Sequence, residues 1–296
     1  MGGILFIVGS IVATGVGYVL YRLFGMTDFV SPFSDREALR VLSCLLFCLL
    51  FGVIGFIDDF AKVAKKQNEG LKPMQKIVLQ VVAAVLWLAA MYWLGDRDTT
   101  IGLGFTSFDI KWFYYPLMVL VILYLTNAVN LTDGVDGLCG TVTLVAMLIF
   151  TLVCSKLQME DYTLYTMALA GGCLGFLVWN LHPAKCFMGD TGSMYLGASV
   201  AAIGLATHQH LTMILVALVY ILEALSVMIQ VTYFKYTKKK YGEGRRIFKM
   251  TPIHHHFEMS GFSEYKIVIT FSLFGAIAGL CGLCLLYTSP SPRDCS

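Results

Sequence analysis

Long apolar runs alternate with short polar segments along the whole chain. Each run is long enough for a helix that crosses about 30 Å of hydrocarbon. The pattern predicts nine membrane-spanning helices, near residues 3–23, 40–57, 77–94, 112–130, 137–155, 163–180, 192–207, 211–234 and 266–286. We therefore expect an all-α fold, a polytopic helical bundle embedded in a membrane.

The composition supports a membrane protein rather than a soluble one. The 296 residues are 57% hydrophobic and 14% charged, whereas soluble domains carry about 25% charged residues. The predicted spans form a single domain over residues 1–286. Residues 287–296 change composition abruptly and resemble a translated adapter sequence, so we expect a non-native tail there. Met1 enters a span without a preceding polar segment, which favours an internal methionine.

Polar clusters rich in acids and histidines occupy alternate connections between the spans. Because successive spans cross in opposite directions, alternate connections lie on the same side of the membrane. Acids at the ends of spans are costly to place and usually functional. The pattern therefore predicts one site on one membrane face, assembled from Asp58-Asp59, residues 130–136, residues 188–190 and residues 254–256.

The distribution of lysine and arginine places that face in the cytoplasm. These residues gather in loops 58–76 and 235–266, on the side that carries the clusters. Cytoplasmic loops of membrane proteins are enriched in such cations. With nine spans, the N-terminus is expected inside and the C-terminus outside.

Two adjacent carboxylates, Asp58 and Asp59, end the second apolar run. They repel each other, so they need a cation, a shared proton or nearby lysines. On a helix their side chains point about 100° apart, which favours one acid toward a metal and the other toward a substrate proton. Lys62 and Lys66 share a helical face suited to phosphate oxygens. A solvated helix end is the alternative, and a prenyl-synthase D-D-x-x-D site is disfavoured because Lys62 replaces the third acid.

Two further clusters offer groups for a nucleotide and a metal. Asn130, Asp133 and Asp136 recur at intervals of three, where they can bond the hydroxyls and imide of a nucleotide; a turn with helix caps is the alternative. Asp190 starts a span between two glycines, where it can bind a hard cation such as Mg²⁺ or cap the helix. Phe187 can stack a base.

Three consecutive histidines, His254, His255 and His256, lie in a long basic loop. Adjacent imidazoles on one helix cannot all reach one metal, so zinc is disfavoured. Contact of one or two of them with phosphate is the favoured interpretation, because Arg245 and Arg246 are near in sequence. The basic run by itself is more typical of an anchor to anionic lipid.

The order of the motifs IDDFAK, NLTDGVDGL, FMGDTGS and FKMTPIHHHFE resembles the polyprenyl-phosphate sugar-1-phosphate transferases. The Pro-x-His-His-His-x-Glu loop resembles the bacterial branch that uses UDP-N-acetylmuramoyl-pentapeptide. The likeness covers residues 1–283. Members of this family usually have ten spans and an additional basic segment, so the resemblance implies that one span and that segment are missing here.

The resemblance implies Mg²⁺-dependent transfer of phospho-N-acetylmuramoyl-pentapeptide from its UDP-linked precursor to undecaprenyl phosphate, giving lipid I and UMP in peptidoglycan synthesis. It implies a multi-pass protein of the bacterial cytoplasmic membrane, in contact with membrane lipids and compatible with a homodimer. Nucleic acid is not an expected partner. By position, it implies that Asp58 deprotonates the lipid phosphate and that Asp59 and Asp190 bind the metal.

The same resemblance implies roles for the other motif residues. The diphosphate is expected near Lys62 and Lys66. His254 is expected to act in catalysis, with His255 and His256 near the sugar or phosphates. The nucleotide is expected near Asn130, Asp133, Asp136, Asn180 and Phe187.

Three alternatives remain open from the sequence. A one-step attack is favoured over an aspartyl intermediate, because Asp58 and Asp59 lie where a lipid headgroup arrives. A related transferase could act on another UDP-N-acetylhexosamine. A secondary transporter with ion-coupled acids is a different class, disfavoured because such acids usually lie near mid-membrane between repeats.

Overall fold

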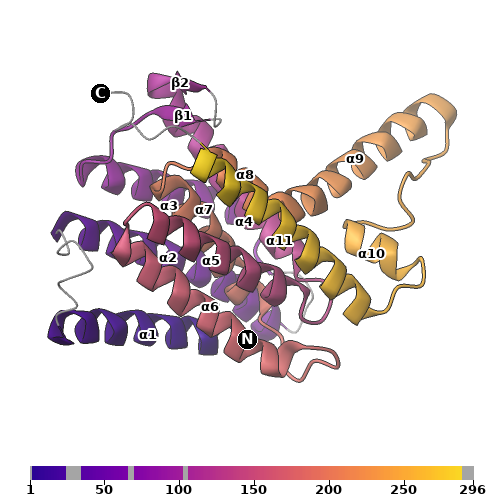
Figure 1. Cartoon of the computed structure of the whole chain (residues 1–296). Helices are drawn as coiled ribbons and strands as arrows, with labels where there is room; N and C mark the ends of the chain where they lie inside the picture. The colour runs from indigo at the N-terminus through magenta and orange to yellow at the C-terminus, as the bar shows by residue number, and fades with distance from the viewer. Residues whose placement is uncertain (1, 25–34, 66–69, 103–105, 289–296) are drawn as a thin grey trace.

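The computed structural model describes residues 2–24, 35–65, 70–102 and 106–288, which form a helical bundle with one small hairpin (Figure 1). Its long helices are α1 (Gly3–Phe24), α2 (Asp35–Lys65), α3 (Pro73–Trp93), α4 (Tyr114–Thr132), α5 (Leu138–Lys156), α6 (Glu160–Asn180), α7 (Gly189–Ala206), α9 (Leu218–Tyr241) and α11 (Glu264–Thr288). The shorter elements are α8 (His210–Val216), α10 (Ile253–Glu258), the 3-10 helix η1 (Lys111–Phe113) and strands β1 (Thr100–Gly102) and β2 (Ser107–Asp109). The all-α prediction is confirmed.

Among the described residues, eight helices are long and apolar enough to cross a membrane. They are α1 to α6, α9 and α11. The remaining predicted span, 192–207, corresponds to α7, whose first turn carries Asp190 and whose residues from Thr191 to Ala206 are all buried. Because α7 packs against α2 and α4, its sides meet protein, and a less apolar sequence is sufficient there.

The predicted span over 211–234 is divided into two helices. α8 ends at Val216 and α9 begins at Leu218. α9 continues to Tyr241 and closes at Gly242, whose φ of 79° is the left-handed conformation that glycine adopts at helix ends. Its last turns are polar but still helical, so it extends beyond the predicted end. In Figure 1, α9 points away from the bundle, above α10.

The hairpin and α10 lie on different sides of the bundle in Figure 1, with the hairpin at the top and α10 at the right. The hairpin pairs Thr100 with Asp109 in antiparallel register. It was not predicted, because strands of three residues are too short to show an alternating pattern.

Some expectations fall at or beyond the limits of the described residues. α11 runs to Thr288, so the first two residues of the expected tail, 287–296, are helical. Residues 289–296, Met1 and Lys66 lie outside the described part of the chain.

Candidate active site

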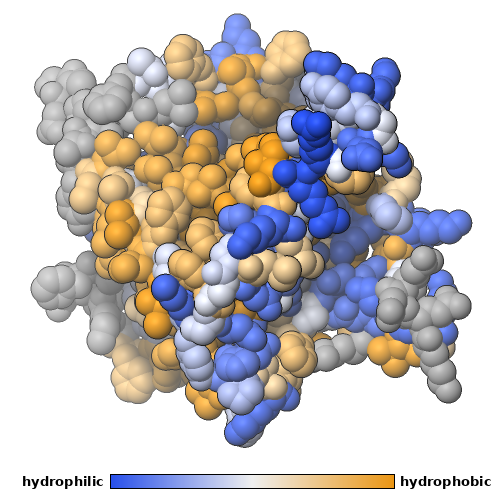
Figure 2. Space-filling model, turned by 90° about the vertical axis from the view of Figure 1, so that its right-hand side faces the viewer, coloured by the Kyte–Doolittle hydropathy of each residue, from blue (hydrophilic) through white to orange (hydrophobic). Residues whose placement is uncertain are grey.

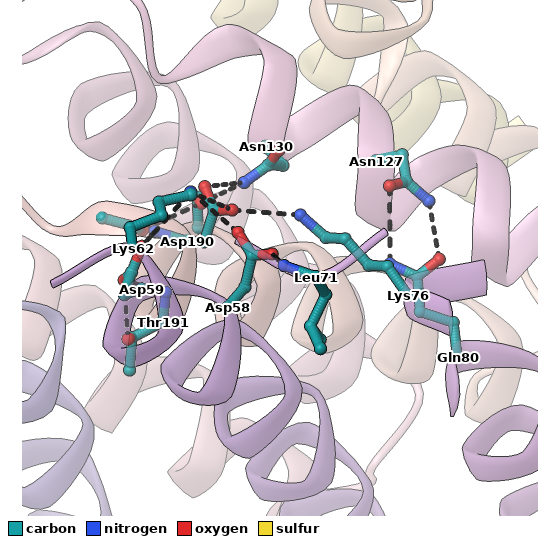
Figure 3. A network of polar contacts seen from close by, with 12 residues as sticks. Asp58, Asp59, Lys62, Leu71, Lys76, Gln80, Asn127, Asn130, Asp190 and Thr191 are labelled. Atoms are coloured by element: carbon teal, nitrogen blue, oxygen red, sulfur yellow. Dashed lines mark hydrogen bonds and ion pairs between the residues drawn. The ribbon is translucent and has the colours of Figure 1, made fainter. Parts of the chain in front are cut away.

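Three carboxylates from two helices meet at one end of the bundle. Asp58 and Asp59 lie near the end of α2, and Asp190 lies in the first turn of α7. Oxygen atoms of the three side chains lie within 4.8 Å of one another (Figure 3). Gly55 permits this approach, because a Cβ at that position would overlap the backbone carbonyl of Asp190. The acids of the first and third predicted clusters therefore meet on one face, as expected.

Two lysines neutralise part of this charge. The Lys62 ammonium lies 2.7 Å from Asp58 Oδ2, 3.7 Å from Asp59 Oδ1 and 3.1 Å from Asp190 Oδ2. Lys76, from the start of α3, lies 3.1 Å from the same Asp190 oxygen. With all groups ionised, three negative charges face two positive ones, so the cluster keeps an excess negative charge.

Each acid is oriented by different partners. Asp58 Oδ1 accepts a hydrogen bond from the backbone N–H of Leu71 at 2.7 Å. Asp59 Oδ2 accepts bonds from the backbone N–H and the hydroxyl of Thr191, at 3.1 and 2.9 Å. Asp190 Oδ1 accepts one from Asn130 Nδ2 at 3.0 Å. The adjacent acids of α2 therefore point to different neighbours, as the helical geometry predicts.

The donor set fits a hard divalent cation. Carboxylate oxygens are the ligands that such ions take, and the Lys62 ammonium already contacts all three acids. One cation can thus be shared by this group. Within this cluster the residues that could hold a metal are Asp58, Asp59 and Asp190; Asp136, His182 and Glu264 form a second such group among the described residues.

The start of α3, which carries Lys76, is joined to α4 by a pair of side-chain hydrogen bonds. Gln80, one turn further along α3, is fully buried. It exchanges two side-chain hydrogen bonds with Asn127 of α4, at 2.9 and 3.4 Å (Figure 3). This pair fixes the start of α3 beside the carboxylates.

The pKa values of two acids at this end are shifted in opposite directions. Burial alone would raise the pKa of Asp190, but the charges of Lys76 and Lys62 and the hydrogen bond from Asn130 hold that pKa below its usual range. Burial, together with the charges of Asp190 and Asp59, raises the pKa of Asp133 to about 7. A pKa near neutrality lets Asp133 gain or lose a proton under ordinary conditions.

Asp136 belongs to a second polar cluster beside the first. Its Oδ2 atom accepts hydrogen bonds from the backbone N–H of Ala184 at 2.9 Å and from His182 Nδ1 at 3.2 Å. Glu264 Oε1, at the start of α11, lies 3.2 Å from the same nitrogen. These contacts join the connections α4–α5 and α6–α7 to α11.

Asn180 and Phe187 bound the connection between α6 and α7. Asn180 is buried and donates a hydrogen bond to the backbone carbonyl of Cys186 at 2.9 Å. The Phe187 side chain is 64% exposed, so its ring is free to meet a ligand. The Asn180 hydrogen bond therefore stabilises this connection, and Phe187 projects from it toward the surface.

The histidine loop reaches the connection between α4 and α5. His254 is fully buried and pairs with Glu223 of α9. His255 pairs with Glu258, and His256 Nδ1 accepts a bond from the backbone N–H of Lys249. All four predicted clusters thus lie at one end of the bundle; Figure 2 faces this side, where hydrophilic residues lie over the right and lower parts of the view beside a hydrophobic area at the upper left.

The sequence reasoning did not assign every residue of this end. Lys76 was counted only among the cations that set the orientation, and Thr191, His182 and Glu264 received no role. Glu223 carried a usable signal, since an acid inside an apolar span is a functional candidate by default.

Comparison with known proteins identifies the family. Residues 41–208 match the family described as glycosyl transferase family 4. A protein of Halalkalibacterium halodurans named phospho-N-acetylmuramoyl-pentapeptide-transferase is 41% identical over 268 residues, which cover 90% of this chain and 81% of the relative. Proteins of the same name from Streptococcus equi subsp. zooepidemicus and Listeria monocytogenes are 39% identical over 295 residues (97% and 84%) and 41% identical over 239 residues (80% and 72%). The chain therefore belongs to glycosyl transferase family 4, in the group of the phospho-N-acetylmuramoyl-pentapeptide transferases.

Proposed function

We propose that this protein transfers phospho-N-acetylmuramoyl-pentapeptide from its UDP-linked precursor to undecaprenyl phosphate, producing lipid I and UMP. The observation that carries the proposal is the meeting of Asp58, Asp59 and Asp190 with Lys62 and Lys76 at one end of a membrane bundle. Phosphoryl transfer depends mainly on positioning and on neutralising charge, which this arrangement supplies. The names of the relatives support the choice of substrate.

The three acids have separate roles in the proposed reaction. Asp58 is the base beside the lipid phosphate, whose oxygen attacks the sugar-bound phosphorus of the diphosphate. A bond to that phosphorus forms as the bond to the bridging oxygen breaks, and UMP leaves with the electron pair. Asp59 and Asp190 hold Mg²⁺, which when bound neutralises charge on the diphosphate.

The lysines and the residues proposed to bind the nucleotide position the UDP-linked substrate. Lys62 and Lys76 face the phosphate oxygens, and Lys66 is proposed to assist them. Phe187 stacks the base, and Asn180 keeps the connection that carries Phe187 in shape. The ribose and base are proposed to lie near Asn130, Asp133 and Asp136, with His255 and His256 beside the phosphates or sugar and the buried His254 behind them.

The protein is a multi-pass membrane protein, and we place its site on the cytoplasmic face of the bacterial inner membrane. Among the described residues, the lysines at the end of α2 and the start of α3 and the arginines after α9 lie at the end with the site, as positive-inside orientation requires. The position of the acids at this end, rather than midway along the helices, argues against an ion-coupled transporter. A homodimer remains a prediction, which the mass of the purified protein in detergent tests.

Release of UMP from the UDP-linked pentapeptide tests the proposal. Each of D58N, D59N and D190N should reduce Mg²⁺-dependent release by at least about 10²-fold, the scale expected for a lost acid–base or charge-stabilising group. Glu37→Gln is the matched control, because Glu37 is exposed at the opposite end of α2. Wild-type rates in all three variants would refute the proposal, and release from another UDP-N-acetylhexosamine alone would change the substrate.

A further inference from the structure

Glu223 of α9 and His254 of α10 are buried against each other where the histidine loop meets α9. Glu223 lies within the membrane-crossing part of α9 and is fully buried, as is His254 of α10. A buried acid in a membrane helix is costly unless it is paired. Glu223 has no role in the transfer reaction as proposed so far.

One oxygen of Glu223 fixes both the backbone and the ring of His254. Glu223 Oε2 accepts a bond from His254 Nδ1 at 3.0 Å and one from the His254 backbone N–H at 3.4 Å. Because the same oxygen already accepts the backbone N–H, we assign the ring proton to Nδ1. The opposite nitrogen, Nε2, is buried without a hydrogen-bond partner within the described ranges, so the ring is packed rather than open to substrate.

His255 packs against this fixed ring at a tilt of 56°. The ring centres of His254 and His255 lie 4.2 Å apart, and His255 Nδ1 is held in turn by Glu258 at 2.8 Å. Both Nε2 atoms face Gly134: a Cβ there would overlap the Nε2 of His254 and lie 3.4 Å from that of His255. The His255 side chain is 23% exposed, so it is the one of the two that a substrate can touch.

We infer that Glu223 is a positioning residue that acts through His254 to set the imidazole of His255 toward the turn at Asp133 and Gly134. His255 then contacts the phosphates or sugar of the UDP-linked substrate, a role that rests on the function proposed above. The carboxylate works as an acceptor that locks one tautomer and one ring orientation, as outer residues do for functional histidines in other sites.

A double-mutant cycle on UMP release tests the inference. Glu223→Met keeps the volume and removes the acceptor, and should lower kcat/KM about 10- to 100-fold, the range for residues that orient a functional histidine. Glu223→Gln keeps an acceptor oxygen and should restore most of the rate. Combining E223M with H255A should lower the rate no further than H255A alone, because both act through one imidazole.

Gln230→Ala is the matched control. Gln230 is also buried on α9, and its Oε1 accepts the backbone N–H groups of Ile247 and Phe248 in the same loop. Its loss loosens the loop near His256 but removes no hydrogen bond to His254 or His255, so its effect should multiply with that of H255A. Multiplicative losses for E223M with H255A as well would overturn the inference.

A second readout needs no substrate. Diethyl pyrocarbonate modifies accessible imidazoles, and mass spectrometry locates the product. In the wild-type protein His255 should react and His254 should be protected. E223M should increase the modification of His254 several-fold, whereas E223Q and Q230A should not.

Continued protection of His254 in E223M would also overturn the inference. If E223M does not fold, His254→Asn replaces it in the kinetic cycle. A wild-type chain that releases no UMP refutes the proposed function separately, and the labelling result still decides whether Glu223 positions the ring.

Discussion

Lys76 Nζ lies 3.1 Å from Asp190 Oδ2, although 114 residues separate them in the chain. The contact joins the start of α3 to the start of α7. It places a second ammonium on an acid that already contacts Lys62. The balance between two lysines and three acids therefore depends on a residue outside the four sequence motifs.

Replacing Lys76 with Met should separate catalysis from metal binding. The cluster would become more negative, so a divalent cation should bind at lower concentration, because opposite charges attract more strongly in a partly buried site. The diphosphate would lose a positive neighbour, and kcat should fall about 10²-fold. UMP release titrated with Mg²⁺ measures both effects.

Lys65→Met is the control for this prediction. Lys65 carries the same charge and is exposed at the end of α2. Its loss should leave both the rate and the Mg²⁺ dependence nearly unchanged. Equal losses in the two variants would mean that Lys76 contributes only general charge.

Gly189 should be needed for the position of Asp59. Its φ is 69°, and a Cβ there would come within 2.6 Å of Asp59 Oδ2. Gly189→Ala should therefore displace that carboxylate and strain the backbone. We expect loss of UMP release beyond what the fall in thermal stability explains.

Gly242→Ala provides a comparison with the same backbone strain. Gly242 has a φ of 79°, and nothing lies within 4 Å of a Cβ built on it. The variant should lose about 1 kcal/mol of stability, the usual penalty for the left-handed conformation, and keep its activity. If both alanine variants lose activity equally, the contact with Asp59 is not the cause.

The helical pattern predicted the face on which the site lies because span direction alternates. The end of α2 and the start of α7 must then share a side, and Asp58, Asp59 and Asp190 do meet. Contacts that depend on how the helices pack could not be predicted this way. The Gln80–Asn127 pair and the bond from Lys76 to Asp190 depend on the rotation of α3 against α4 and α7, and apolar length alone does not determine rotation.

The division of the eighth predicted span at Ala217 had no sequence signal. The residues around the break are apolar, with neither proline nor glycine at the break itself. His254 illustrates the same limit: three adjacent histidines look equivalent in sequence, while the fold buries one of them completely and leaves its neighbour partly exposed.

Asp133 should make stability depend on pH. Its pKa rises from 3.8 to about 7 in the folded protein, so the folded state keeps a proton that the unfolded chain releases. That stabilising effect is full below about pH 4 and is lost as pH rises through 7. Asp133→Asn should therefore raise the melting temperature more at pH 8 than at pH 5.

Two comparisons check the cause of this pH effect. Added Mg²⁺ should reduce the difference, because it offsets the charges of Asp59 and Asp190 that raise the pKa of Asp133. Asp109→Asn should show no such change between pH 5 and pH 8, since hydrogen bonds to Asp109 lower its pKa and keep it ionised throughout. A pH-independent gain from Asp133→Asn would contradict the prediction.

His182 should hold the α4–α5 and α6–α7 connections against α11. Its Nδ1 atom lies 3.2 Å from both Asp136 Oδ2 and Glu264 Oε1, so His182→Ala leaves two carboxylates facing each other without a shared partner. The connection between α6 and α7 should then loosen, raising KM for the UDP-linked substrate several-fold with a smaller change in kcat.

His208→Ala is the matched control, because His208 forms a similar pair with Asp96, at 2.8 Å, beyond the far end of α7. That variant should lose stability and keep its KM; a KM that rises equally in both variants would show that loss of bundle stability, rather than the cluster at Asp136, controls substrate binding.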